Sequence, residues 1–142
     1  LFLISLIILI VSTVSIGYGV PNLIILLISI LWLGIFTGSL SLLLSVLQIR
    51  FRDISYLTQS SLGLLYYFTP IIYDLKMIPI RYRLVYYFNP LTSIVEYMRL
   101  ALVKDGIIPV GIVTANLLIT MLILVGSILL FRRERKFMVD WL

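Results

Sequence analysis

The sequence of 142 residues contains no cysteine and no histidine, and it has only six acidic residues. These absences exclude a thiol nucleophile, a disulfide framework, a zinc site of the usual kind and histidine acid–base chemistry. The phosphate-binding pattern GxxxxGK[ST] is also missing, so we expect this chain itself to bind no ATP and no other cofactor. The six acids are scattered, with no pair close enough to suggest a shared site, which disfavours an enzyme.

Charge is scarce as well, since charged residues make up 12% of the chain against about 25% in a typical soluble domain. Hydrophobic side chains make up 62%, and the mean hydropathy is +1.19. This number of charged residues is too small to cover the surface of a soluble domain. We therefore expect most of the chain to lie in lipid. Nucleic-acid binding is disfavoured despite the net charge of +5.

The hydrophobic runs predict an all-α polytopic membrane protein, because a bilayer core of about 30 Å is spanned by about 20 apolar residues. We expect one transmembrane domain over 1–142, with four membrane spans at about 1–16, 23–47, 56–73 and 110–131. The first run begins at Leu1 without a preceding charge, which suggests a membrane helix whose beginning is missing. The spans 23–47 and 110–131 carry no charged residue, which disfavours an ion-driven transporter.

The segment 74–109 is too apolar for a solvated loop and is interrupted at Asn89-Pro90. We predict a pair of short outer helices hinged at this point, which re-enter the outer leaflet and pack on protein rather than on lipid. Glu96 and Arg99 stand three residues apart on the second of these helices and are predicted to form a structural pair.

Orientation follows from the basic residues, because short cytoplasmic segments are enriched in lysine and arginine. The dense charges around Arg50 and Arg52, and those of the tail 132–142, predict that both segments lie in the cytoplasm. Asp53 sits beside the two arginines. This charged junction is either a membrane anchor with a local ion pair or a contact for a cytoplasmic partner, and the composition leaves both open.

Two further patterns each allow two interpretations. The stripe of small residues Gly34, Gly38 and Ser41 favours close helix packing, either within the chain or between subunits. A tyrosine cluster at the outer end of the third span forms either an aromatic belt at the headgroups or a path on which sugar rings stack. Its members are Tyr66, Tyr67, Tyr73, Tyr86 and Tyr87.

Four segments, in order, resemble motifs of ABC-2 type transporter permeases. They are VLQIRFRD at 46–53, FTPIIY at 68–73, FNPLT at 88–92 followed by Glu96 and Arg99, and FRRERKF at 131–137. The resemblance covers nearly the whole chain. It is strongest to the branch that exports polysaccharides and their lipid-linked forms, such as O-antigen, capsule and teichoic acid.

The resemblance implies a six-span permease that works as a homodimer with two separate ATPase subunits, which would hold the ATP and Mg. This chain would then be the C-terminal portion, spans three to six, in the cytoplasmic membrane. Arg50, Arg52 and Asp53 would lie near the ATPase, and the outer helices near the exit of a path for a lipid-linked glycan. The alternatives are a permease for a drug or small lipid, a non-transporting membrane scaffold subunit and, least favoured, a membrane-embedded enzyme.

Overall fold

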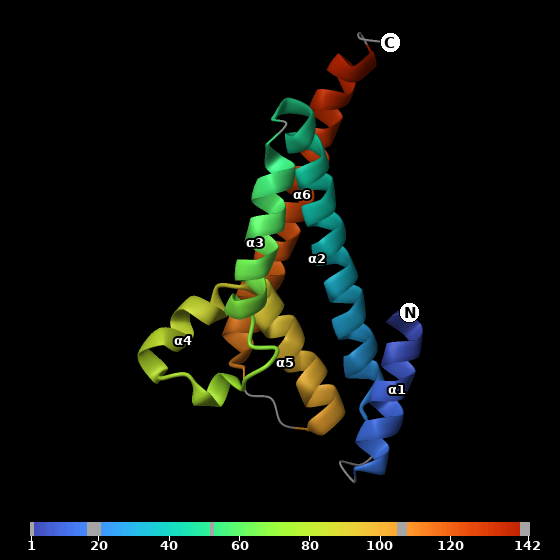
Figure 1. The fold of residues 1–142 in the computed structure, drawn as a ribbon, viewed down its shortest axis with the longest axis vertical. Coiled ribbons are helices and arrows are strands. Elements are labelled where there is room, and N and C mark those ends of the chain that lie inside the picture. Colours follow the sequence, from blue (N-terminus) through green and yellow to red (C-terminus); the bar gives the residue numbers. More distant parts are fainter. Residues whose placement is uncertain (1, 17–20, 52, 105–107, 140–142) are drawn as a thin grey trace.

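The computed structural model describes residues 2–16, 21–51, 53–104 and 108–139, and in these ranges it contains helices and no strand. The prediction of an all-α chain is therefore confirmed for the described residues. The elements, shown in Figure 1, are α1 (Phe2–Ser15), α2 (Leu23–Arg50), α3 (Ile54–Phe68), the 3-10 turn η1 (Leu75–Met77), α4 (Ile80–Tyr87), α5 (Pro90–Val103) and α6 (Val110–Val139).

Two of the helices are long and apolar enough to cross a membrane: α2 along its whole length and α6 over Val110–Glu134. Both exceed the roughly 20 residues that a bilayer core requires. The other two predicted spans correspond to α1, with 14 residues, and α3, with 15 residues. These lengths fall below about 20 residues, so the total of four spans remains a prediction.

The core of the molecule lies where α2, α5 and α6 meet. Its buried apolar residues are Trp32 and Phe36 from α2, Ile94 from α5 and Val113 from α6. Trp32 Nε1 donates a hydrogen bond of 3.0 Å to Thr120 Oγ1, which joins α2 to α6. An indole N–H buried among apolar groups is stabilised by such a partner, so this bond fixes how the two long helices face each other.

The helix of the third predicted span ends before Tyr73, where the span was expected to end. The helix α3 ends at Phe68, because Thr69 has an extended backbone with φ −107° and ψ 126°. Thr69 precedes Pro70, whose ring disfavours the helical conformation of the residue before it and which has no N–H to donate. The chain after Phe68 therefore leaves the helix and turns toward η1.

The segment after Asp74 contains two short helices, α4 and α5, that meet at Asn89 and Pro90. Asn89 is the N-cap of α5, and its Oδ1 accepts a hydrogen bond of 3.1 Å from Leu91 N. Pro90 occupies the first helical position, where its missing N–H costs nothing. Whether the two helices re-enter a membrane remains a prediction.

Figure 1 shows how the ends of the helices are distributed. The α2–α3 turn and the C-terminal end of α6 lie at one end of the molecule, whereas η1, α4 and α5 lie at the other. The segments predicted to be cytoplasmic are thus at the same end, opposite the outer helices. Their assignment to the cytoplasmic side remains a prediction.

Candidate functional site

One side of α3 carries a row of uncharged polar and aromatic residues, which we call the α3 polar face. At 3.6 residues per turn its members fall within about 140° of the helix circumference. They are Ser55, Tyr56, Gln59, Ser60, Gly63, Tyr66 and Tyr67. Tyr56 is 75% exposed and Tyr67 is 69% exposed, and no residue of α3 is buried.

The other two sides of α3 differ in character. Ile54, Thr58 and Leu65 are half-buried and lie on the side that faces the rest of the molecule. Leu57 and Leu64 are exposed and apolar, which suits a side turned to lipid. The α3 polar face is therefore a distinct surface, and apart from the half-buried Ser55 its residues are exposed in the described structure.

Four of the five tyrosines predicted to line a path or form a belt are brought together. The rings of Tyr66 and Tyr67 meet edge to face at 5.7 Å between centroids. The Tyr73 hydroxyl donates a hydrogen bond of 2.6 Å to the Tyr67 carbonyl, and its ring lies 6.2 Å from that of Tyr86. Tyr87 takes a different position and lines a pocket between α4 and α6. Whether the cluster is a path or a belt remains a prediction.

Arg99 of α5 connects its helix to the segment that follows α3. Its Nη1 donates a hydrogen bond of 2.8 Å to Glu96 Oε1 and lies 3.6 Å from Asp74 Oδ1. Its Nη2 donates to the carbonyls of Pro70, at 3.2 Å, and Tyr73, at 3.4 Å. Because Glu96 is only 3% exposed, the guanidinium neutralises a carboxylate that has been removed from solvent.

Asn89 makes a second connection at the same place. Its Nδ2 donates to Thr69 Oγ1 at 3.1 Å and to the Phe68 carbonyl at 3.4 Å, while its Oδ1 caps α5. Thr69 and Pro90 are both buried beside it. A single side chain therefore begins α5 and holds the end of α3.

Asn116 of α6 is a connecting residue that we did not predict as part of the site. Its Nδ2 donates to the Tyr87 carbonyl at 3.0 Å and to Ser93 Oγ, which joins α6 to both α4 and α5. The available signal is a lone amide within an uncharged and mostly apolar run. That signal indicates an interhelical hydrogen bond without naming the partner.

At the other end of the molecule, the charged junction is exposed. Arg50 is the last residue of α2, and Asp53 precedes α3 without a capping hydrogen bond from its side chain. Arg52, predicted to act with them, lies outside the described residues. Gln48 Nε2 donates to Ser55 Oγ at 2.7 Å, so an amide and a hydroxyl hold the two helices together across the turn.

The small-residue stripe of α2 is exposed. Gly34, Gly38 and Ser41 all face away from the core, and a Cβ added at either glycine meets nothing within 4 Å. Within this copy of the chain, no described atom lies close to either glycine. Close packing at the stripe, within the chain or between subunits, remains a prediction.

The apolar helices and the family match together define an integral membrane protein. Residues 1–103 match the family model described as ABC-2 type transporter, and the chain belongs to this family. Two relatives from Klebsiella pneumoniae, both named O-antigen export system permease protein RfbA, are each 36% identical to this chain over 61 residues. That stretch is 43% of this chain and 24% of each relative, so it covers about a quarter of their length.

Proposed function

We propose that this chain belongs to the membrane-spanning permease subunit of an ATP-driven ABC exporter that moves a lipid-linked polysaccharide across the cytoplasmic membrane. Membership of the ABC-2 family supports a transporter subunit rather than an enzyme. The similarity to O-antigen export permeases supports a glycan as the substrate. The observation that carries the proposal is the α3 polar face.

A polar helix face inside a bilayer is stable only where protein or water covers it. The α3 polar face offers hydroxyl groups, one amide and three tyrosines, and it has no charged residue. Hydroxyls and amides hydrogen-bond sugar hydroxyls, and tyrosine rings stack on the apolar faces of sugars while their hydroxyls find polar partners. These groups suit the passage of a glycan better than that of an ion.

The remaining parts of the proposal concern the assembly. A separate ABC ATPase binds ATP and Mg and contacts the end of the molecule that carries Arg50, Arg52 and Asp53. Two permease copies form a homodimer in the lipid bilayer, with four spans from this chain and the tail 132–142 in the cytoplasm. The outer helices α4 and α5 dip into the membrane beside the exit, and Tyr66, Tyr67, Tyr73, Tyr86 and Tyr87 line it.

Adjacent serines on α3 provide a matched test. Ser60 belongs to the α3 polar face and Ser61 does not, and both are exposed. In cells that depend on the full-length permease, Ser60→Leu combined with Gln59→Leu is expected to reduce surface glycan about tenfold, equivalent to about 1.4 kcal/mol. Ser61→Leu is expected to leave surface glycan near the wild-type level. Equal export by the two variants would refute a path along this face.

The alternatives give different results in the same cells. Unchanged glycan with altered drug resistance or lipid release would assign the chain to a drug or small-lipid permease. Purification in mild detergent without any P-loop ATPase would favour a non-transporting scaffold. The proposal predicts co-purification of such an ATPase and stimulation of its ATP hydrolysis by the permease.

A further inference from the structure

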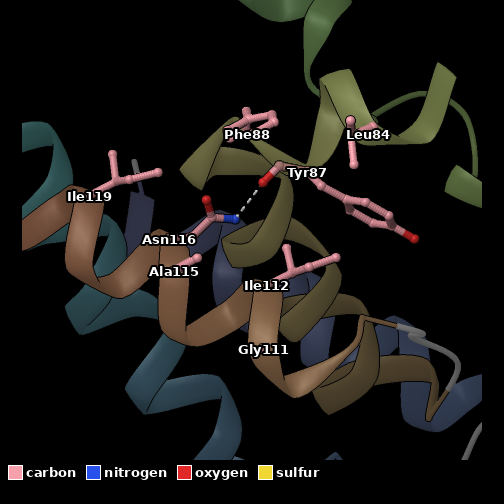
Figure 2. A pocket seen from close by; sticks show the side chains of 8 residues that line it. All are labelled: Leu84, Tyr87, Phe88, Gly111, Ile112, Ala115, Asn116 and Ile119. Atoms are coloured by element: carbon pink, nitrogen blue, oxygen red, sulfur yellow. Dashed lines mark hydrogen bonds between the residues drawn. The ribbon is translucent and has the colours of Figure 1, made fainter.

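A pocket of about 160 Å³ lies between α4 and the first turns of α6. Figure 2 shows it from close by. Tyr87 and Phe88 border it from the α4 side, and Gly111, Ala115 and Ile119 from α6. The lining is apolar except for the Tyr87 hydroxyl and for Asn116, whose amide lies among these side chains. The pocket is separate from the α3 polar face.

The Asn116 amide has a buried acceptor that no described residue pairs with. The residue is 1% exposed, and its Oδ1 accepts no hydrogen bond from the described part of the chain, whereas Nδ2 donates to the Tyr87 carbonyl and to Ser93 Oγ. Because a carbonyl only accepts, the nitrogen is the atom that faces Tyr87, and this fixes the orientation of the amide. In Figure 2 the oxygen points toward the side of the pocket between Phe88 and Ile119.

We propose that this pocket binds a small membrane-dissolved amphiphile, with an apolar body about the size of a benzene ring and one hydroxyl group that donates to Asn116 Oδ1. An apolar cavity of about 150 Å³ accommodates benzene, so the volume fits. The ligand hydroxyl would donate a hydrogen bond to Asn116 Oδ1. This bond is favourable because a buried acceptor without a hydrogen bond lowers the stability of the folded protein. Phospholipid tails carry no donor and therefore leave this oxygen unpaired.

Because Asn116 Oδ1 is buried, a side chain that lines the pocket has to move before a ligand reaches this oxygen, and Phe88 is a candidate. Its ring stands at the edge of the pocket in Figure 2, and its side chain is 70% exposed. An exposed ring changes rotamer readily. A ligand that turns Phe88 aside and reaches Asn116 contacts α4 and α6 together, so it steadies α4 on α6. This inference does not depend on the proposed transport function.

The test uses the complete permease in lipid nanodiscs and two fluorinated rings that differ by one hydroxyl group, 4-fluorophenol and fluorobenzene. Binding is followed by ¹⁹F NMR, with partition into the lipid subtracted from empty nanodiscs. We expect saturable binding of 4-fluorophenol, about tenfold tighter than that of fluorobenzene, as one added hydrogen bond provides.

A matched pair of glycines tests the location. Gly111 lines the pocket and Gly126 lies further along α6, and a Cβ added at either position meets nothing within 4 Å. Both leucine variants are therefore expected to fold. Gly111→Leu fills the pocket and is expected to abolish saturable binding, whereas Gly126→Leu is expected to leave it unchanged.

Three results would overturn the proposal. Equal affinities for the two rings would remove the role of the Asn116 oxygen. Equal loss of binding in the two glycine variants would place the binding elsewhere. The absence of saturable binding in the wild-type protein would show that the pocket takes no such ligand.

Discussion

Replacing Arg99 by methionine is expected to detach α5 from the segment that follows α3. The substitution removes a hydrogen bond to Glu96 and those to the carbonyls of Pro70 and Tyr73. Methionine keeps much of the length and apolar stem of arginine, so the change tests the guanidinium rather than the volume of the side chain.

The magnitude follows from the burial of the two partners. Removing one member of a buried ion pair costs about 3–5 kcal/mol, and hydrogen bonds to a charged group contribute about 1.5–3 kcal/mol each. The Glu96 side chain is 4% exposed, whereas that of Arg99 is 21% exposed. Because Arg99 is partly accessible to solvent, we expect a loss near the lower end of the range for a buried ion pair. This is about 3 kcal/mol in the free energy of unfolding.

The measurement is the free energy of unfolding of the full-length protein in mixed micelles. The control is Arg81→Met, because the Arg81 guanidinium lies 4.8 Å from the ring of Tyr82 at an exposed site. We expect that control to cost less than about 1 kcal/mol.

The double variant Glu96→Met/Arg99→Met removes both charges and is expected to be more stable than Arg99→Met alone, since no buried carboxylate then remains at position 96. Two results would refute the reasoning: a loss for Arg99→Met no larger than that for Arg81→Met, or exact additivity of the two single changes in the double variant.

The other predictions concern Asn89, Trp32 and Gly34. Asn89→Ala removes the α5 cap and the bonds to the end of α3, and is expected to cost about 2 kcal/mol in unfolding free energy. Asn22→Ala, which loses only a 3.4 Å cap bond, is expected to cost less. Trp32→Phe removes the bond to Thr120 and is expected to lower the unfolding free energy by about 1 kcal/mol, and Thr120→Val is expected to cost less in this variant than in the wild-type protein. Gly34→Leu is expected to leave the secondary structure seen by circular dichroism unchanged, but to weaken cross-linking between permease copies, and unchanged cross-linking would contradict an interface there.

Hydropathy and local signals predict much of this fold. The predicted starts of the second and fourth spans, at 23 and 110, coincide with the first residues of α2 and α6. Asn89 and Pro90 carry a signal that depends only on neighbouring residues, since an asparagine cap followed by proline begins a helix. The end of α3 at Phe68 was also readable, because Pro70 restricts Thr69, but the apolar run to Tyr73 outweighed that signal in the prediction.

The parts that could not be predicted depend on contacts between distant residues. Spacing pairs Glu96 with Arg99, but it does not reveal that Arg99 also reaches the carbonyls of Pro70 and Tyr73. The orientation of Gly34 is another example. A small residue favours close packing, yet the side of α2 that packs is decided by Trp32 and Phe36, whose bulk occupies the core and turns the glycine outward.

The scarcity of buried residues in α3 has a mechanical consequence. The helix has no buried side chain of its own, and side chains anchor it at its two ends: Gln48 on Ser55 at one, and Asn89 and Arg99 on the residues around Thr69 at the other. Because few side contacts hold α3 between its ends, the helix can shift or rotate as a stiff rod at little cost in packing. We therefore expect a displacement of the α2–α3 turn to reach α5 through α3, so that the outer helices and the charged junction at the opposite end move together.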